Sequence, residues 1–128
     1  MGCRLPSPGG LALTERAVFL CSFEKGARIA DIGCGDGHTV GFLREKFGLD
    51  ALGIDCDSEI ISKAAKNGCE WAACADSVSM PFDCECFDGV FFECSFSKMN
   101  EPSKALEEAY RILKTNGRIV ISDFYARG

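Results

Sequence analysis

The chain has 128 residues, of which 47% are hydrophobic and 26% are charged, and its formal net charge at pH 7 is −5. This length predicts a single domain, residues 1–128, and the composition is that of a globular protein rather than a disordered or fibrous chain. No apolar run approaches the roughly 20 residues of a membrane-spanning helix, and the N-terminus lacks the apolar core of a secretory signal. A negative chain without a basic run lacks the footprint of a nucleic-acid-binding protein. We therefore expect neither a membrane nor nucleic acid as a partner.

The nine cysteines indicate a reducing compartment rather than a framework of disulfides. Their number is odd, no export signal precedes them, and the chain is long enough to form a core without covalent links. A metal site is not expected, because the chain has one histidine and its closest cysteine pair, Cys84 and Cys86, lacks the spacing of zinc ligands. These features predict a cytoplasmic protein.

The elements predicted along the chain begin with an arm and a helix. Residues 1–10 contain two prolines and a Gly-Gly pair, which predict a loop or arm. Residues 11–25 predict a helix that ends before Gly26. The remaining core, residues 27–123, alternates between strands and helices. Short apolar runs predict strands at residues 28–32, 51–55, 70–75, 87–93 and 118–123.

Three helices are predicted between these strands. The first lies between the first two strands, where apolar residues recur at helical spacing. The second can be capped by Asp57 or Ser58 and ends at Asn67-Gly68. The third has Pro102 in its first turn and is expected to end at Asn116-Gly117.

This alternation predicts parallel strands joined by right-handed crossovers. The predicted strands are apolar on both faces, as expected for a sheet that helices cover on each side. The expected fold class is therefore α/β, an open, Rossmann-like, doubly wound parallel sheet. Ligands of such sheets bind beyond the carboxyl ends of the strands, so the residues that follow each strand are the candidate site.

A glycine-rich loop, Asp31-Ile-Gly-Cys-Gly-Asp-Gly37, follows the first predicted strand. Gly33 permits a tight turn, and Gly35 lets a ligand approach the backbone. The dinucleotide fingerprint G-x-G-x-x-G would need a glycine where this chain has His38, which disfavours a nicotinamide dehydrogenase. No Lys-Ser/Thr pair follows the loop, so it is not a Walker loop.

Acidic residues follow the second and third predicted strands. Asp55 can accept hydrogen bonds from both ribose hydroxyls and would repel a 2′-phosphate, which excludes a ligand like NADP. Asp76, followed by Ser77, can accept a hydrogen bond from an exocyclic amine. The loop and these acids predict a pocket for an adenosine ligand that has no phosphate and can carry positive charge.

These motifs resemble the class I S-adenosylmethionine-dependent methyltransferases, in particular small-molecule enzymes similar to the ubiquinone/menaquinone and arsenite methyltransferases. The resemblance covers residues 27–123. The glycine loop at residues 31–37 resembles motif I of the family, and Asp55 matches its ribose-binding acid. Residues 75–77 and 80–82 resemble the motif on the adenine side of the family's cofactor site, and residues 87–93 match its fourth strand. Residues 110–117 resemble the R-x-L-K-P-G-G turn before its fifth strand.

The resemblance implies S-adenosylmethionine as the cofactor and a small molecule as the methyl acceptor. It places the methionine part of the cofactor on the glycine loop, the ribose on Asp55, and the adenine on Asp76 and Ser77. The candidate cofactor-binding residues are Asp31, Gly33, Cys34, Gly35, Gly37, Asp55, Cys56, Asp76, Ser77, Glu93 and Cys94.

One departure from the family concerns length. The family fold continues past its fifth strand to a seven-stranded sheet, whereas this chain ends at Gly128, so the expected core lacks strands 6 and 7. The strand at 118–123 would then be an exposed apolar edge. A second copy could cover it in a homodimer. Alternatively, the chain is a truncated or non-catalytic module that binds S-adenosylmethionine.

Methyl transfer from a sulfonium needs positioning and exclusion of water more than acid–base groups, so we assign no catalytic residue. His38 is either a base near the cofactor or a polar residue of a first helical turn. Glu93 either binds a cation or proton of the acceptor or is a strand-end carboxylate bonded to backbone amides. Phe96 and Met99 belong either to an acceptor pocket or to the core.

The cysteines allow two interpretations. Cys34, Cys56 and Cys94 each follow a predicted strand and so are expected near the cofactor. Four more cysteines lie in or around the third predicted strand and the loop after it, namely Cys69, Cys74, Cys84 and Cys86. Some of these seven thiols could bind a soft acceptor such as trivalent arsenic. The alternative is that they are small buried residues in a chain that is rich in cysteine.

Overall fold

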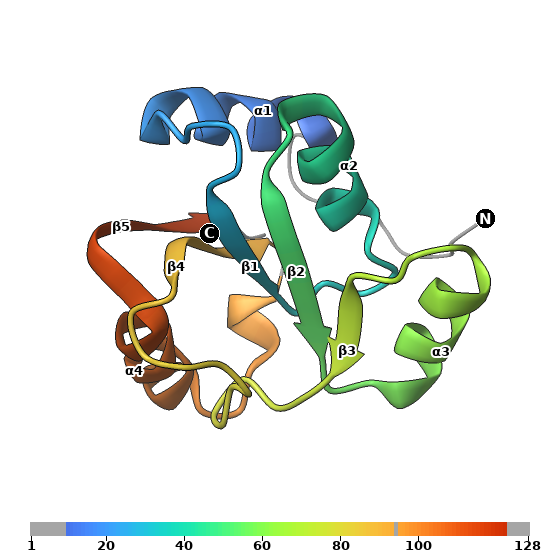
Figure 1. Ribbon diagram of the computed structural model, residues 1–128. Coiled ribbons are helices and arrows are strands. Elements are labelled where there is room, and N and C mark those ends of the chain that lie inside the picture. Colours follow the sequence, from blue (N-terminus) through green and yellow to red (C-terminus); the bar gives the residue numbers. More distant parts are fainter. Residues whose placement is uncertain (1–9, 94, 123–128) are drawn as a thin grey trace, which may run out of the picture.

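The computed structural model describes residues 10–93 and 95–122 (Figure 1). Residues 1–9, Cys94 and residues 123–128 lie outside this part, and with them the predicted arm and the end of the last predicted strand. The elements are α1 (Gly10–Cys21), β1 (Arg28–Ile32), α2 (His38–Phe47), β2 (Asp50–Asp55), α3 (Ser58–Lys66), β3 (Ala72–Cys74), β4 (Phe87–Glu93), the 3₁₀ turn η1 (Phe96–Lys98), α4 (Pro102–Ile112) and β5 (Leu113–Ser122).

The strands form one five-stranded sheet in the order β3-β2-β1-β4-β5, and every adjacent pair is parallel. This arrangement confirms the predicted α/β fold class. The order reverses between β1 and β4, and the carboxyl ends at such a reversal leave a crevice where ligands bind. The candidate site is therefore expected beyond β1, β2 and β4.

Helices cover both faces of the sheet, as Figure 1 shows for α1 and α2 on one side and α4 on the other. Two apolar clusters account for this arrangement. Phe91 packs with Val18 of α1 and Leu43 of α2, whereas its neighbours Val90 and Phe92 pack with α4. Because successive side chains of a strand point to opposite faces, β4 must be apolar throughout to fill both clusters.

The last helix and strand differ from the prediction. α4 ends at Ile112, and Leu113 is already extended and pairs with Phe87 of β4. The backbone N–H of Cys86 donates to the carbonyl of Ile112, so the last turn is bound by a neighbouring segment instead of continuing. Asn116 has the left-handed φ of 71° expected of an Asn-Gly pair, but it lies in a bend of β5 and not at the end of the helix.

The remaining elements agree with the prediction to within a few residues, and β3 is shorter than expected, at three residues. At the edge of the sheet, Ile121 of β5 is 48% exposed. Over the residues that the structure describes, no helix has the length and apolar character needed to cross a membrane.

Candidate functional site

The glycine loop lies between the end of β1 and the start of α2. The backbone N–H groups of Gly33 and Cys34 both donate to the carbonyl of Ile54, at 2.8 and 2.9 Å, which ties the loop to β2. Gly33 has a φ of 79°, and a Cβ at this position would lie 2.5 Å from the Cβ of Ser95. Only glycine fits there, because the loop turns in a left-handed conformation against the segment that follows β4.

The carboxylate of Asp55, the last residue of β2, is directed at the glycine loop. Its Oδ2 accepts a hydrogen bond from the N–H of Gly35 at 2.9 Å, and its Oδ1 accepts one from the N–H of Asp57 at 2.9 Å. These two bonds fix the orientation of the carboxylate. Each carboxylate oxygen can accept more than one hydrogen bond, so Asp55 keeps capacity for a ligand hydroxyl.

A cavity of about 460 Å³ opens beside this pair, at the carboxyl ends of β1 and β2. Its volume is within the range of ligand sites, roughly 300–1,000 Å³. Its wall contains four acidic residues and one basic residue, Lys98. The acidic residues are Asp55, Asp57, Asp76 and Glu101. This charge balance favours a neutral or cationic ligand over a phosphate.

Six of the predicted site residues line the cavity, namely Gly33, Gly35, Asp55, Cys56, Asp76 and Ser77. The carboxylate of Asp76 accepts a hydrogen bond from the N–H of Val78 at 3.1 Å, which turns the chain after β3 toward the cavity. The predicted residues Asp31, Cys34, Gly37 and Glu93 are buried and do not line the cavity. Cys94 lies outside the described residues.

Several lining residues were missed by the sequence analysis. Ile60 and Val78 give the cavity apolar walls, and Asn100 and Glu101 come from the segment that follows η1. Asp57 was recognised only as the cap of α3, where its Oδ1 accepts from the N–H groups of the first turn. In this segment the sequence analysis singled out only Met99 as a pocket candidate, because the place of Asn100 and Glu101 over the cavity depends on the position of β4 in the sheet.

Glu93 has hydrogen-bond partners that the sequence analysis did not foresee. It is buried, and its carboxylate accepts hydrogen bonds from the side-chain hydroxyls of Thr14 and Thr39 rather than from backbone amides. Its contact with an acceptor stays a prediction. His38 is exposed in the first turn of α2 and does not line the cavity, which favours its interpretation as a polar residue of the helix.

The aromatic and thioether candidates divide between core and cavity. Phe96 stacks edge-on against Phe92 at 5.3 Å between ring centroids and packs on the core. Met99 contacts the same core cluster and also lines the cavity. Met99 is therefore the better candidate for contact with a ligand.

The cysteines of the described residues do not converge on one point. Cys34 is fully buried beneath Gly53, where a Cβ would lie 2.6 Å from the Cβ of Cys34. Cys56 is exposed at the cavity, and the Cys74 thiol donates to the carbonyl of Cys56 at 3.6 Å. In the described ranges, 10–93 and 95–122, no group of three or more Cys, His, Asp or Glu is placed to hold a metal ion.

An ion pair on α4 holds the segment that leads away from Asp76 and Ser77 at the cavity wall. The Arg111 guanidinium binds the Glu108 carboxylate at 2.6 Å and donates to the carbonyls of Met80 and Phe82 at 2.9 and 2.7 Å. The N–H of Met80 donates to Glu108 at 2.8 Å. The hydrogen bond from Arg111 lowers the pKa of the Glu108 carboxyl. The segment after Ser77 is thus fixed by one pair of side chains.

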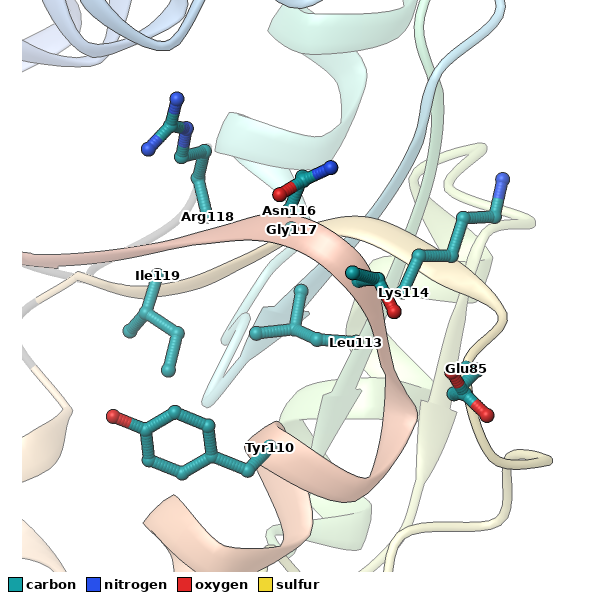
Figure 2. A pocket seen from close by; sticks show the side chains of 9 residues that line it. Glu85, Tyr110, Leu113, Lys114, Asn116, Gly117, Arg118 and Ile119 are labelled. Atoms are coloured by element: carbon teal, nitrogen blue, oxygen red, sulfur yellow. The ribbon is translucent and has the colours of Figure 1, made fainter.

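A larger cavity, of about 620 Å³, lies where β5 begins, beside Tyr110 and Arg118 (Figure 2). This is the amino end of the sheet. Neither the glycine loop nor the acids of the strand ends reach it. Since parallel sheets bind ligands at their carboxyl ends, the cavity beside Asp55 is the candidate site.

Residues 30–121 match the family model described as "Methyltransferase domain", which is well over half of the chain. The chain belongs to the class I S-adenosylmethionine-dependent methyltransferases. The resemblance found in the sequence is thereby confirmed. S-adenosylmethionine is the cofactor of this family, and the acid-lined cavity with its glycine loop suits a cationic nucleoside without phosphates.

Two of the relatives are named as quinone methyltransferases, and another is named a probable tRNA methyltransferase of Bos taurus. The chain is 33% identical over 121 residues to 2-phytyl-1,4-beta-naphthoquinone methyltransferase of Arabidopsis thaliana, which is 84% of this chain and 46% of that protein. It is 32% identical over 116 residues to demethylmenaquinone methyltransferase of Thermus thermophilus, 86% of this chain and 53% of that protein. The chain thus spans about half the length of these two quinone methyltransferases.

A solved structure shows the same fold with a cofactor product. Phosphoethanolamine N-methyltransferase 2 of Haemonchus contortus, in complex with phosphomonomethylethanolamine and S-adenosylhomocysteine, superposes with a TM-score of 0.82 at 25% identity. The match covers 90% of this chain and 29% of that one.

Proposed function

We propose that the cavity beside Asp55 binds S-adenosylmethionine and that the protein transfers the methyl group to a small-molecule acceptor. The observation that carries the proposal is the hydrogen bond between the Asp55 carboxylate and the Gly35 N–H. It brings a hydroxyl-binding acid and a glycine loop together on one cavity wall, which is what a nucleoside with an adjoining amino-acid group requires.

Different residues of the cavity wall bind different parts of the cofactor in this proposal. Gly33 and Gly35 leave room for the methionine part, Asp55 accepts from the ribose, and Asp76 with Ser77 faces the adenine. The bound cofactor supplies an activated methyl group, which passes to a nucleophile of the acceptor while the C–S electron pair returns to sulfur. Ile60 and Val78 exclude water from the adenine side, and the acids of the wall favour the positive charge of the sulfonium.

A small acceptor is supported by the charge of the chain and by the substrates named for its relatives. The chain carries a formal charge of −5, which disfavours a nucleic-acid acceptor. A quinone methyltransferase and an amine methyltransferase are among the proteins it resembles. A second candidate is a module that binds the cofactor without turnover, since the chain spans about half the length of these quinone methyltransferases.

A cytoplasmic location and a homodimer remain predictions.

The test is formation of S-adenosylhomocysteine from S-adenosylmethionine with a panel of small quinols, phenols and amines and with tRNA. The account predicts turnover with a small molecule, and loss of this turnover in Asp55→Ala. Asp83→Ala is the matched control, because Asp83 is an exposed acid that does not line the cavity. Methylation of tRNA alone would contradict a small acceptor. Cofactor binding without any turnover would favour the second candidate.

A further inference from the structure

A buried carboxylate joins three elements on one face of the sheet. Glu93, the last residue of β4, is only 3% exposed. Its Oε2 accepts a hydrogen bond from the hydroxyl of Thr14 in α1 at 2.7 Å. Its Oε1 accepts one from the hydroxyl of Thr39 in α2 at 3.1 Å. Both threonines are buried as well, so the three side chains form a closed polar cluster within an apolar layer.

Among the described residues, the side-chain partners of the Glu93 carboxylate are hydroxyls and not cations. In the part of the chain that the structure describes, no lysine, arginine or histidine forms an ion pair with Glu93. A buried carboxylate is costly unless it is hydrogen-bonded, and hydrogen bonds to an ionised oxygen are stronger than neutral ones. Thr39 is the second residue of α2, so the positive end of that helix also favours the carboxylate. The loss of either hydroxyl would leave a buried oxygen unsatisfied.

The cluster lies directly behind the glycine loop. α2 begins where the loop ends, so the bond from Thr39 to Glu93 fixes the point at which the loop becomes a helix. The Ser95 hydroxyl donates to the carbonyl of Ile32 at 2.7 Å and fixes the start of the loop to the same segment. On the other side, the loop is bound by Asp55 through Gly35. The loop is therefore held between a carboxylate at the end of β2 and a carboxylate at the end of β4.

We propose that Glu93 is a positioning residue for the glycine loop of the cofactor site. Its carboxylate, through Thr39, sets the position of the glycine loop, and through Thr14 it holds α1 against the same end of the sheet. Glu93 does not line the cavity, so its effect reaches the ligand through the loop. This inference rests on the proposed function, because it concerns the loop on which the cofactor is proposed to bind.

The threonines allow variants that separate the hydroxyl from the shape of the side chain. Thr39→Val keeps the shape and removes the donor, whereas Thr39→Ser keeps the donor. Glu93→Gln keeps the size but replaces one acceptor oxygen by an amide nitrogen. Thr115→Val is the matched control, because Thr115 is exposed and far from the loop in the bend of β5.

The experiment is calorimetric titration of each variant with S-adenosylhomocysteine, at a temperature where thermal melting shows the variant to be folded. Thr39→Val and Glu93→Gln are expected to raise Kd about tenfold, because a glycine loop that is no longer held in place must be ordered when the ligand binds. Thr39→Ser and Thr115→Val are expected to stay close to the wild type. Amide hydrogen exchange at residues 33–37 should be faster in Thr39→Val and normal in Thr39→Ser.

The outcomes separate this inference from the proposed function. If the wild-type chain does not bind S-adenosylhomocysteine, the proposed function fails. If the wild type binds and both Thr39→Val and Glu93→Gln bind with unchanged Kd, the positioning role is wrong even where their melting temperatures fall. If Thr39→Val does not fold, the Kd values of Glu93→Gln and Thr39→Ser are compared instead. A higher Kd in Glu93→Gln alone supports the positioning role, and equal Kd values contradict it.

Discussion

The carboxylate of Asp55 accepts a hydrogen bond from the backbone N–H of Gly35 at 2.9 Å, and this bond joins the end of β2 to the glycine loop. Both residues line the same cavity. The bond orders the loop before a ligand arrives, which reduces the entropy that binding must overcome. It makes Asp55 a structural residue of the loop as well as a candidate ligand of the cofactor.

Replacement of Gly33 by alanine is predicted to destabilise the chain. Gly33 has a φ of 79°, and an added Cβ would lie 2.5 Å from the Cβ of Ser95. The left-handed conformation alone costs about 1–2 kcal/mol for a residue with a Cβ, and relief of the contact adds to it. Urea denaturation should show the lower free energy of unfolding.

Gly41→Ala is the control for this substitution. Gly41 lies inside α2, and a Cβ there meets nothing within 4 Å. Alanine is favoured over glycine inside a helix by up to about 1 kcal/mol, so this variant should be as stable as the wild type or more so. Equal destabilisation by the two substitutions would contradict the close contact at Gly33.

Arg111→Ala is predicted to loosen the segment that follows Asp76 and Ser77 on the cavity wall. The variant loses the bonds to the carbonyls of Met80 and Phe82 and leaves Glu108 without its cation. The pair is partly exposed, so we expect a loss of about 1–2 kcal/mol in the free energy of unfolding. Lys104→Ala, which removes a solvent-exposed pair with Glu101, should change the free energy of unfolding much less than Arg111→Ala does. Thermal unfolding of both variants tests this ranking.

The stability of the chain should depend on pH through Glu108. The hydrogen bond from Arg111 lowers the pKa of Glu108 in the folded state, so the folded chain binds this proton less readily than the unfolded chain. The stabilisation is therefore present above the unfolded pKa, about 4.3, and is lost as the pH falls through the folded value. Between pH 6 and pH 3, the free energy of unfolding should fall less steeply in Glu108→Gln than in the wild type. Equal slopes would contradict a contribution of Glu108 to the pH dependence.

Thiol labelling should report the ligand at the cavity. Cys56 is exposed on the cavity wall, and Cys84 is exposed outside it. S-adenosylhomocysteine is predicted to slow labelling of Cys56 and to leave Cys84 unchanged, as followed by mass spectrometry of the labelled peptides. Cys34 is fully buried and should label slowly with or without ligand. Burial raises the pKa of the Cys86 thiol, which should make Cys86 slower than Cys84.

The sequence predicted those site residues that follow strands. The glycine loop, Asp55 and Asp76 come after three consecutive strands, and the carboxyl ends of neighbouring parallel strands meet at one edge of the sheet. Their convergence at the cavity therefore follows from the alternation of strands and helices alone.

Contacts between distant segments could not be predicted in this way. Thr14 and Glu93 are separated by 79 positions, and nothing in the pattern around Thr14 distinguishes it from a polar residue on a helix surface. The end of α4 at Ile112 depends on bonds from Glu85 and Cys86, which compete with the helical signal of the residues that follow. In both places tertiary hydrogen bonds determine the structure, and a single sequence does not encode them locally.

The most direct test of the account is calorimetric titration of the 128-residue chain with S-adenosylhomocysteine, with NADH as the competing ligand class. The account predicts saturable binding of S-adenosylhomocysteine at one site, weakened in Asp55→Ala and unchanged in Asp83→Ala, and no binding of NADH. A folded chain that binds NADH, or that binds S-adenosylhomocysteine equally well without the Asp55 carboxylate, would contradict the site described beside β2.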